Sequence, residues 1–208
     1  MASRLPIVLV NGKLSELPST DVLSVIVSTG SYAITASSAL LTITSSYSIS
    51  PFIKADASEF ITRLSSGCNI TSSETSTNFI NRTFLAFDPV SVEYAQYWFN
   101  WPPDWTSAKV TFYWTATANS GSAVLYAGMR TFANASSQNG VIGEYQGVIS
   151  TYTGSNICIE STTNPITPSG SIGPLQRTVL QIYRDSIHPS DNLITDLLLE
   201  GVVIYKGS

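Results

Sequence analysis

The clearest pattern in the chain is a two-residue alternation of apolar and polar side chains. In residues 109–117, Val110, Phe112 and Trp114 fall on one face, while Tyr113 falls on the other face together with three threonines. An alternation with this period is typical of a β-strand that is buried on one side only. The segment therefore predicts a strand whose apolar face packs against a core.

Similar segments recur through the last three-fifths of the chain, and stretches rich in Pro, Asn and Gly separate them. They lie at residues 83–87, 95–101, 109–117, 123–127, 146–151, 157–160, 178–183 and 197–205. Short strands with regular turns and no helical period are typical of β-sandwiches. We expect an all-β fold, with an antiparallel jelly-roll-like sandwich at residues 84–208.

The aromatic residues cluster in this region, and all four tryptophans lie between Tyr94 and Trp114. Aromatic side chains bury the largest areas, so the cluster predicts the core, with Phe99, Phe112 and Trp114 inside it. Rings on a surface can instead stack on sugars. The candidate glycan-facing residues are Trp98, Trp101, Trp105 and Tyr113, and we expect Trp101 or Trp105 to be only partly covered.

The N-terminal residues 1–52 have a different character. A short apolar run at 5–10 precedes Asn11-Gly12 and the segment 14–17 continues beyond it, which predicts a β-hairpin. Residues 31–52 carry almost no charge and show a weak seven-residue repeat, and their pattern fits a helix or a strand equally well. We expect this segment to mediate attachment and oligomerisation; the alternative is an ordinary strand of the sandwich.

Residues 53–83 are expected to connect the two parts. Residues 57–64 fit two helical turns, with Phe60 and Leu64 on one face, and a loop or extended segment follows them.

Composition narrows the range of functions. The net charge is −4 without any cluster of Lys or Arg, which argues against a nucleic-acid partner. No segment has the roughly 20 apolar residues that span a membrane, and residues 1–17 lack the pattern of a signal peptide. Cys68 and Cys158 match no metal or redox motif, and we expect unpaired thiols, with a disulfide as the alternative.

No catalytic motif stands out. His188 is the only histidine, and no nucleophile elbow accompanies it. Asp88, Glu93 and Asp104 flank the aromatic segment as candidate glycosidase carboxylates, but acidic residues beside Pro are ordinary turn residues. Asp185, Asp191 and Asp196 carry oxygen ligands for calcium, but they lack the alternating spacing of a calcium loop. We therefore expect no enzyme activity, no metal and no cofactor.

Several motifs together resemble a sandwich domain of virion structural proteins in tailed bacteriophages. They are Phe87-Asp88-Pro89, Phe99-x-x-Pro-x-x-Trp105, Phe112-x-Trp114-Thr115-Ala116 and the segment from Arg184 to Tyr205. Residues 31–52 also resemble a fragment of a tail-fibre shaft. The resemblance implies a jelly-roll-like domain in a homo-oligomer. It also implies that Arg184, Asp185, Asp191 and Asp196 belong to a structural hairpin.

The main hypothesis is a non-enzymatic phage virion protein, namely a short fibre, an adaptor or a head decoration protein. It would form a homotrimer, dock onto other virion proteins through its N-terminal segment, and reside in virions assembled in the host cytoplasm. The alternative is a carbohydrate-binding module that recognises a host surface glycan through the Trp/Tyr cluster. Exposed, coplanar rings at one end of the sandwich would favour this alternative.

Overall fold

The computed structural model describes residues 7–10, 13–16, 52–154 and 156–207. The chain divides into two compact units, Met1–Ser45 and Ser46–Ser208. In the first unit, β1 (Ile7–Val10) and β2 (Lys13–Glu16) pair antiparallel with Val10 opposite Lys13. This register leaves two residues between the strands, as the Asn11-Gly12 pair predicts. The choice between helix and strand for residues 31–52 lies outside the described residues, except for Phe52.

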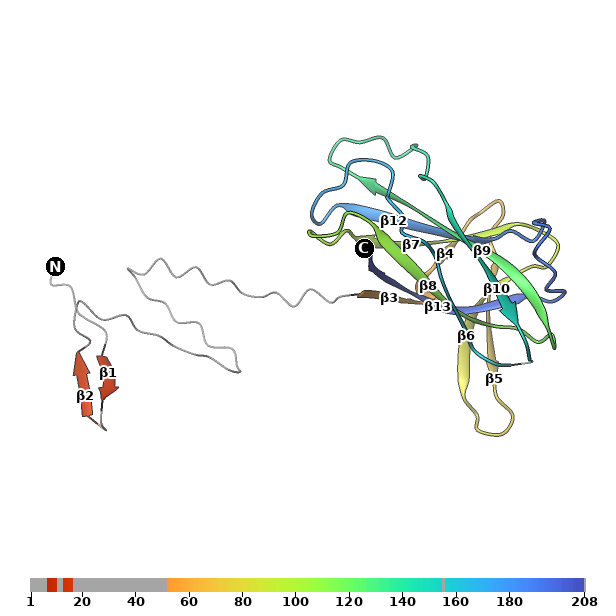
Figure 1. Cartoon of the computed structure of the whole chain (residues 1–208), viewed down its shortest axis with the longest axis horizontal. Helices are drawn as coiled ribbons and strands as arrows, with labels where there is room; N and C mark the ends of the chain where they lie inside the picture. The colour runs from red at the N-terminus through yellow and green to blue at the C-terminus, as the bar shows by residue number, and fades with distance from the viewer. Residues whose placement is uncertain (1–6, 11–12, 17–51, 155, 208) are drawn as a thin grey trace. The chain divides into compact units, whose positions relative to one another are not determined.

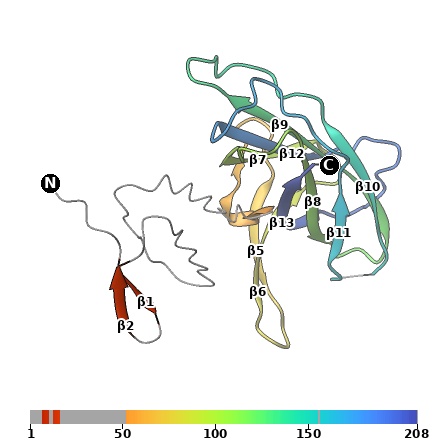
Figure 2. The same cartoon turned by 60° about the vertical axis from the view of Figure 1, so that its left-hand side comes forward.

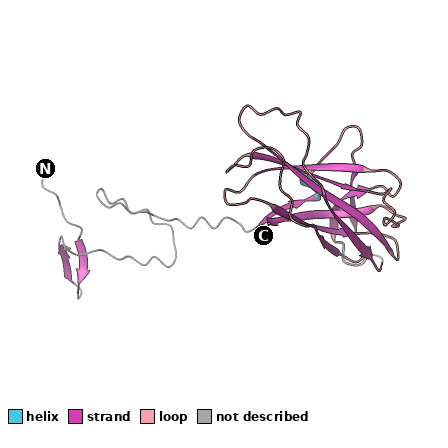
Figure 3. Ribbon diagram, turned by 45° about the horizontal axis from the view of Figure 1, so that its top comes forward, coloured by secondary structure: helices cyan, strands magenta, loops and turns pink. Residues whose placement is uncertain are grey.

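The second unit is an all-β sandwich of two antiparallel sheets, and the expected fold class is confirmed (Figures 1 and 3). The five-stranded sheet has the order β10 (Gln146–Tyr152), β9 (Gly121–Phe132), β12 (Arg177–Arg184), β7 (Glu93–Asn100) and β4 (Ile61–Thr62). The other sheet has the order β11 (Ile159–Thr162), β8 (Ala108–Thr115), β13 (Leu197–Lys206), β6 (Asn81–Phe87) and β5 (Asn69–Glu74), and β3 (Phe52–Asp56) also pairs with β13. Among the described residues, no helix is long and apolar enough to cross a membrane.

The strand β13 holds the second sheet together. Along one side it pairs with β8 over almost its whole length. On its other side, Leu197–Leu199 face β6, and Gly201–Tyr205 face β3. The register with β8 shifts between Leu199 and Gly201, and this irregularity falls where the partner changes from β6 to β3.

Residues 53–83, expected as a connector, contribute strands to the sandwich. β3 pairs with β13, β4 with β7, and β5 with β6. The helix expected at residues 57–64 is a single 3-10 turn, Ala57–Glu59. The Glu59 carboxylate accepts a hydrogen bond from the Asp56 backbone N–H at 2.8 Å and caps this turn, and Phe60 is already extended. Phe60 is buried in the core, whereas Leu64 is fully exposed.

The β5–β6 hairpin extends beyond the rest of the sandwich (Figure 2). Every residue of β5 is exposed, and Phe79 and Ile80 are exposed in the turn that follows it.

The core lies between the two sheets and contains Phe99, Phe112 and Trp114. The indole N–H of Trp114 lies 3.2 Å from the Ser150 hydroxyl and 3.3 Å from the Ser161 hydroxyl. These serines belong to β10 and β11, which are edge strands of opposite sheets. Since a buried indole N–H without a partner is costly, this contact fixes how the two edges meet.

Candidate functional site

The outer face of the five-stranded sheet carries a row of three tyrosines. Tyr94 of β7, Tyr183 of β12 and Tyr126 of β9 lie opposite one another in the register. The ring centroids of Tyr183 lie 5.0 Å from those of both Tyr94 and Tyr126, and the Tyr126 ring is stacked on it at 10°. All three side chains are partly exposed. They form a continuous aromatic surface across three strands.

A polar row follows on the same face. Gln96 and Gln181 lie opposite each other, and the Gln96 amide donates a hydrogen bond to Gln181 Oε1 at 2.8 Å. Gln181 Nε2 lies 2.5 Å from the hydroxyl of Tyr145. Tyr145 comes from the loop between β9 and β10 and packs edge-on against Tyr183 with a centroid distance of 5.2 Å. A Cβ on Gly128 would lie 2.7 Å from the Tyr145 ring, so glycine provides the space for it.

The third row is aromatic and cationic. Trp98 and Phe132 are stacked at a centroid distance of 5.5 Å. The guanidinium of Arg177 lies 5.5 Å from the Trp98 ring, and that of Arg130 lies 5.2 Å from the Phe132 ring. At the tyrosine end, the Arg63 guanidinium lies 4.4 Å from the Tyr94 ring. These distances are within the range of cation–π contacts.

Burial favours the protonated form of two phenols on this face, Tyr183 and Tyr145. It raises the pKa of Tyr183 well above the ordinary value of 10.0, and neighbouring tyrosines and Asp185 add to the effect. Burial also raises the pKa of Tyr145. Both hydroxyls therefore remain neutral donors and acceptors of hydrogen bonds near neutral pH.

The candidate glycan-facing residues do not share one surface. Trp101 and Trp105 have exposed fractions of 0 % and 3 %, so the expectation that one of them is only partly covered is wrong. The Trp101 indole N–H donates to the Trp105 carbonyl at 2.7 Å, and the rings meet edge to face, so the Pro102-Pro103 loop folds both tryptophans into the core. Only Trp98 lies on the aromatic face described above.

Tyr113 lies on the outer face of the other sheet. There it lines a cavity of about 340 Å³ with Lys54, Asp56, Glu200 and residues 201–203. A hydrogen bond with Tyr205 is the main cause that raises the pKa of Tyr113 to about 12. The cavity carries a single aromatic ring, so it does not reproduce the rows of the five-stranded sheet.

The tyrosines and glutamines of the aromatic face were not among the sequence candidates. One signal for them was present, because Tyr94, Gln96 and Trp98 follow one another with the two-residue period of a strand face. Their partners Tyr126, Tyr183 and Gln181 are distant in sequence and join them only through the strand register.

The candidate catalytic carboxylates have local structural partners. Glu93 Oε2 accepts a hydrogen bond from the Asp88 backbone N–H at 2.9 Å, and Asp104 pairs with Lys206 at 2.8 Å. Strand β7 runs from Glu93 to Asn100 and separates the two residues by about 23 Å of extended chain. A glycosidase pair needs a separation of about 5–10 Å. This arrangement therefore contradicts the pairing of Glu93 with Asp104 as a hydrolase site.

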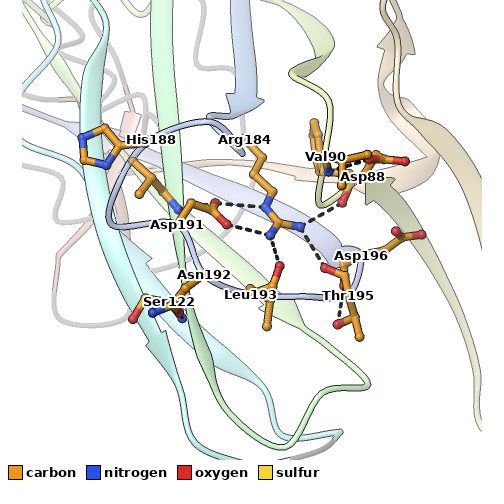
Figure 4. Close-up of polar contacts among 12 residues, drawn as sticks. Asp88, Val90, Ser122, Arg184, His188, Asp191, Asn192, Leu193, Thr195 and Asp196 are labelled. Atoms are coloured by element: carbon orange, nitrogen blue, oxygen red, sulfur yellow. Dashed lines mark hydrogen bonds and ion pairs between the residues drawn. The ribbon is translucent and has the colours of Figure 1, made fainter.

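The remaining chemical candidates take part in loop structure. His188 Nδ1 accepts a hydrogen bond from the Ser190 backbone N–H at 3.1 Å. Asp191 holds the buried guanidinium of Arg184, which also donates to the carbonyls of Leu193 and Thr195 (Figure 4). Within the described ranges, no cluster of three His, Cys, Asp or Glu residues could hold a metal ion. Cys68 is buried, Cys158 is exposed, and both thiols are free.

No family model and no curated protein matches the chain. Among solved structures, it resembles a family 35 carbohydrate-binding module from Clostridium thermocellum, with 10% identity, a TM-score of 0.46, and coverage of 75% of this chain and 98% of that one. A family 11 carbohydrate-binding module from the same organism, in complex with a β-1,3-1,4-mixed-linked tetrasaccharide, has 9% identity, a TM-score of 0.44, and coverage of 75% and 96%.

A third similar structure is the CBM36-1 domain of a multidomain xylanase from the hindgut metagenome of Trinervitermes trinervoides. It has 11% identity, a TM-score of 0.43, and coverage of 76% of this chain and 98% of that one. All three TM-scores are under 0.5, so these likenesses assign neither a family nor a ligand to the chain.

Proposed function

We propose that this protein is a non-catalytic carbohydrate-binding protein and that the ligand lies on the outer face of the five-stranded sheet. The observation that carries the proposal is the alternation of rings and amides along β7, where Tyr94, Gln96 and Trp98 point outward in succession. Sugar rings present apolar faces that pack on aromatic rings and hydroxyls that pair with amides. A glycan chain lying along β7 and β12 would meet both kinds of group.

The face is built in advance of binding. Gln96, Gln181 and Tyr145 are joined by hydrogen bonds, and the tyrosine rings pack against one another. Side chains that are already ordered lose little conformational entropy when a ligand binds. Strand β12 pairs antiparallel with both β7 and β9 along its whole length, which fixes the spacing of the rows.

Trp98 gives a direct test. The other three tryptophans are buried, so binding on this face should change the fluorescence of Trp98 alone. The protein would be titrated with a panel of soluble polysaccharides and followed by fluorescence and by retardation in gels that contain the polysaccharide. We expect Trp98→Ala to abolish retardation, because stacking on this ring is lost.

Tyr113→Ala is the matched control, because it removes a partly exposed ring from the opposite sheet. We expect it to bind as the wild type does. If Tyr113→Ala abolishes binding and Trp98→Ala does not, the ligand lies in the cavity of the other sheet. Retardation by none of the polysaccharides would contradict the proposal.

The virion role expected from the sequence is a second proposal, and it concerns the whole chain. It is favoured by the compact unit Met1–Ser45, which contains the β1–β2 hairpin and is separate from the sandwich. In this proposal residues 1–52 attach the protein to other phage virion proteins and form the homotrimer. The similar structures named above are carbohydrate-binding modules and not phage proteins. A glycan-binding sandwich would suit such a protein as its means of contacting a host surface.

A further inference from the structure

Within the described part of the chain, three arginines on the aromatic face form no ion pair with a carboxylate. The ion pairs within the described residues are Lys54–Asp56, Arg82–Glu200, Arg184–Asp191 and Lys206–Asp104. Arg63, Arg130 and Arg177 form none of them and instead lie over aromatic rings. These three arginines bring positive charge to this face, although the chain has a net charge of −4 and Asp185 lies near Tyr183.

The three arginines differ in accessibility. Arg63 and Arg177 are exposed. Arg130 is partly buried under the loop between β9 and β10, where its Nη1 donates to the Val141 carbonyl at 2.9 Å and Gly140 lies against its guanidinium. The two arginines that can reach a ligand are therefore Arg63 and Arg177.

These two arginines stand at opposite ends of the row of rings and amides. The guanidinium of Arg63 lies over the Tyr94 ring, and that of Arg177 lies 5.5 Å from the Trp98 ring. Tyr94 and Trp98 are four positions apart on β7, which is about 13 Å along the strand. A ligand that lies along β7 would pass the rings and amides between two positive charges.

We propose that the glycan bound by this face is acidic, with carboxylate or sulfate groups that pair with Arg63 and Arg177. This inference rests on the proposed function and names the class of its ligand. A guanidinium presents a planar fork of N–H donors that matches such anions, and it keeps this fork when it packs on a ring. Each arginine is held over a ring, so the donors are partly positioned before the anion arrives.

Single-stranded nucleic acid is also an anionic polymer, and its bases can stack on aromatic side chains. Proteins that bind it track many phosphates with a groove of basic residues. This face offers two accessible arginines, and the chain as a whole is acidic. The charge balance therefore favours an acidic polysaccharide, and a single-stranded oligonucleotide serves as a competing ligand in the test.

The experiment uses the full chain and two matched pairs of polymers. Polygalacturonic acid is compared with its carboxyl-reduced form, and dextran sulfate with dextran, by gel retardation and fluorescence titration at two salt concentrations. Arg63→Gln and Arg177→Gln are compared with Lys54→Gln, which removes the same charge from the outer face of the other sheet. We expect binding to one acidic polymer over its neutral partner, and an affinity loss of about tenfold for each arginine variant, as for one charge-assisted hydrogen bond.

The Lys54 variant should bind as the wild type does. Equal binding of the acidic and neutral partners, with Trp98 required and the arginines not, would overturn the inference and leave the proposed function intact. An arginine-dependent preference for the oligonucleotide over both acidic polysaccharides would also overturn it. Failure to bind any polysaccharide, including the neutral ones, would overturn the proposed function itself.

Discussion

Arg184 and Asp191 form a two-point ion pair that is closed off from solvent. Arg184 Nε lies 3.0 Å from Asp191 Oδ2, and Nη2 lies 2.7 Å from Oδ1, with exposed side-chain fractions of 0% and 1%. The same guanidinium donates to the Phe87 carbonyl at 3.2 Å and the Thr195 carbonyl at 2.9 Å. It thereby ties the end of β6 to the loop that leads into β13.

This pair predicts a large loss of stability when one partner is removed. Asp191→Ala leaves the Arg184 charge buried without a counter-charge and also frees the Val124 backbone N–H, which donates to Asp191 at 3.0 Å. We expect the free energy of unfolding in urea to fall by about 3–5 kcal/mol. Asp104→Ala is the control, because it breaks an exposed pair with Lys206 and should leave that free energy almost unchanged. Equal losses of unfolding free energy for Asp191→Ala and Asp104→Ala would contradict the prediction that the buried ion pair contributes more to stability than the exposed one.

Alkaline pH should weaken the fold through the buried phenols. The pKa values of Tyr183 and Tyr145 are raised by burial, so the folded state keeps their protons while the unfolded chain loses them near pH 10. The stabilisation is complete below pH 10 and is lost as the pH rises above it. Urea unfolding at several pH values from 8 to 11 should show this decline, and Tyr183→Phe should make it shallower. Trp98→Phe, on the same face, removes no titrating group and should leave the slope unchanged.

The two cysteines should differ in reactivity. Burial raises the pKa of Cys68 to about 12, whereas Cys158 is exposed. Because the thiolate is the reactive form, a disulfide reagent at pH 8 should modify one thiol in the native protein and two after denaturation. Cys158→Ser should abolish the native reaction. A protein with no reactive thiol even after denaturation would instead contain a disulfide.

The boundary between the two units predicts opposite outcomes for two truncations. Removing residues 1–45 should leave the midpoint of thermal unfolding unchanged, because the second unit begins at Ser46. Removing residues 1–83 also deletes β3, β4 and β5, which pair with β13, β7 and β6, and should leave an insoluble chain.

Light scattering of the full chain and of the shorter truncation tests the expected trimer. If residues 1–52 assemble it, only the full chain will have the mass of a trimer.

The two-residue alternation was sufficient to predict most strands of the sandwich. It succeeded for β8 because Phe112 and Trp114 are buried on one face while Tyr113 is partly exposed on the other. It failed for β5, whose exposed and mostly polar residues follow no apolar alternation and are ordered by pairing with β6. The helical spacing of Phe60 and Leu64 also gave a wrong prediction, because residues 57–64 form a capped 3-10 turn followed by a strand.

The candidate site was less predictable, since it depends on which strands are neighbours. Tyr94 and Tyr126 join only because β12 lies between their strands and contributes Tyr183. Conversely, Trp101 and Trp105 flank a proline turn, a position that favours exposure, yet the loop packs both rings inward. Local sequence carries neither the strand order nor the direction in which a loop folds back.

The position of β13 has a consequence for synthesis of the chain. Its neighbours β3, β6 and β8 all leave the ribosome before it does, and its pairing with β3 joins residues about 150 positions apart. The six-stranded sheet is therefore incomplete until residue 206 has emerged. Until then, β3, β6 and β8 each have an edge without its partner strand β13. Sheets assembled from such remote partners fold slowly. A nascent chain of this kind is exposed to aggregation, and a premature stop codon anywhere before β13 should yield no usable fragment of the sandwich.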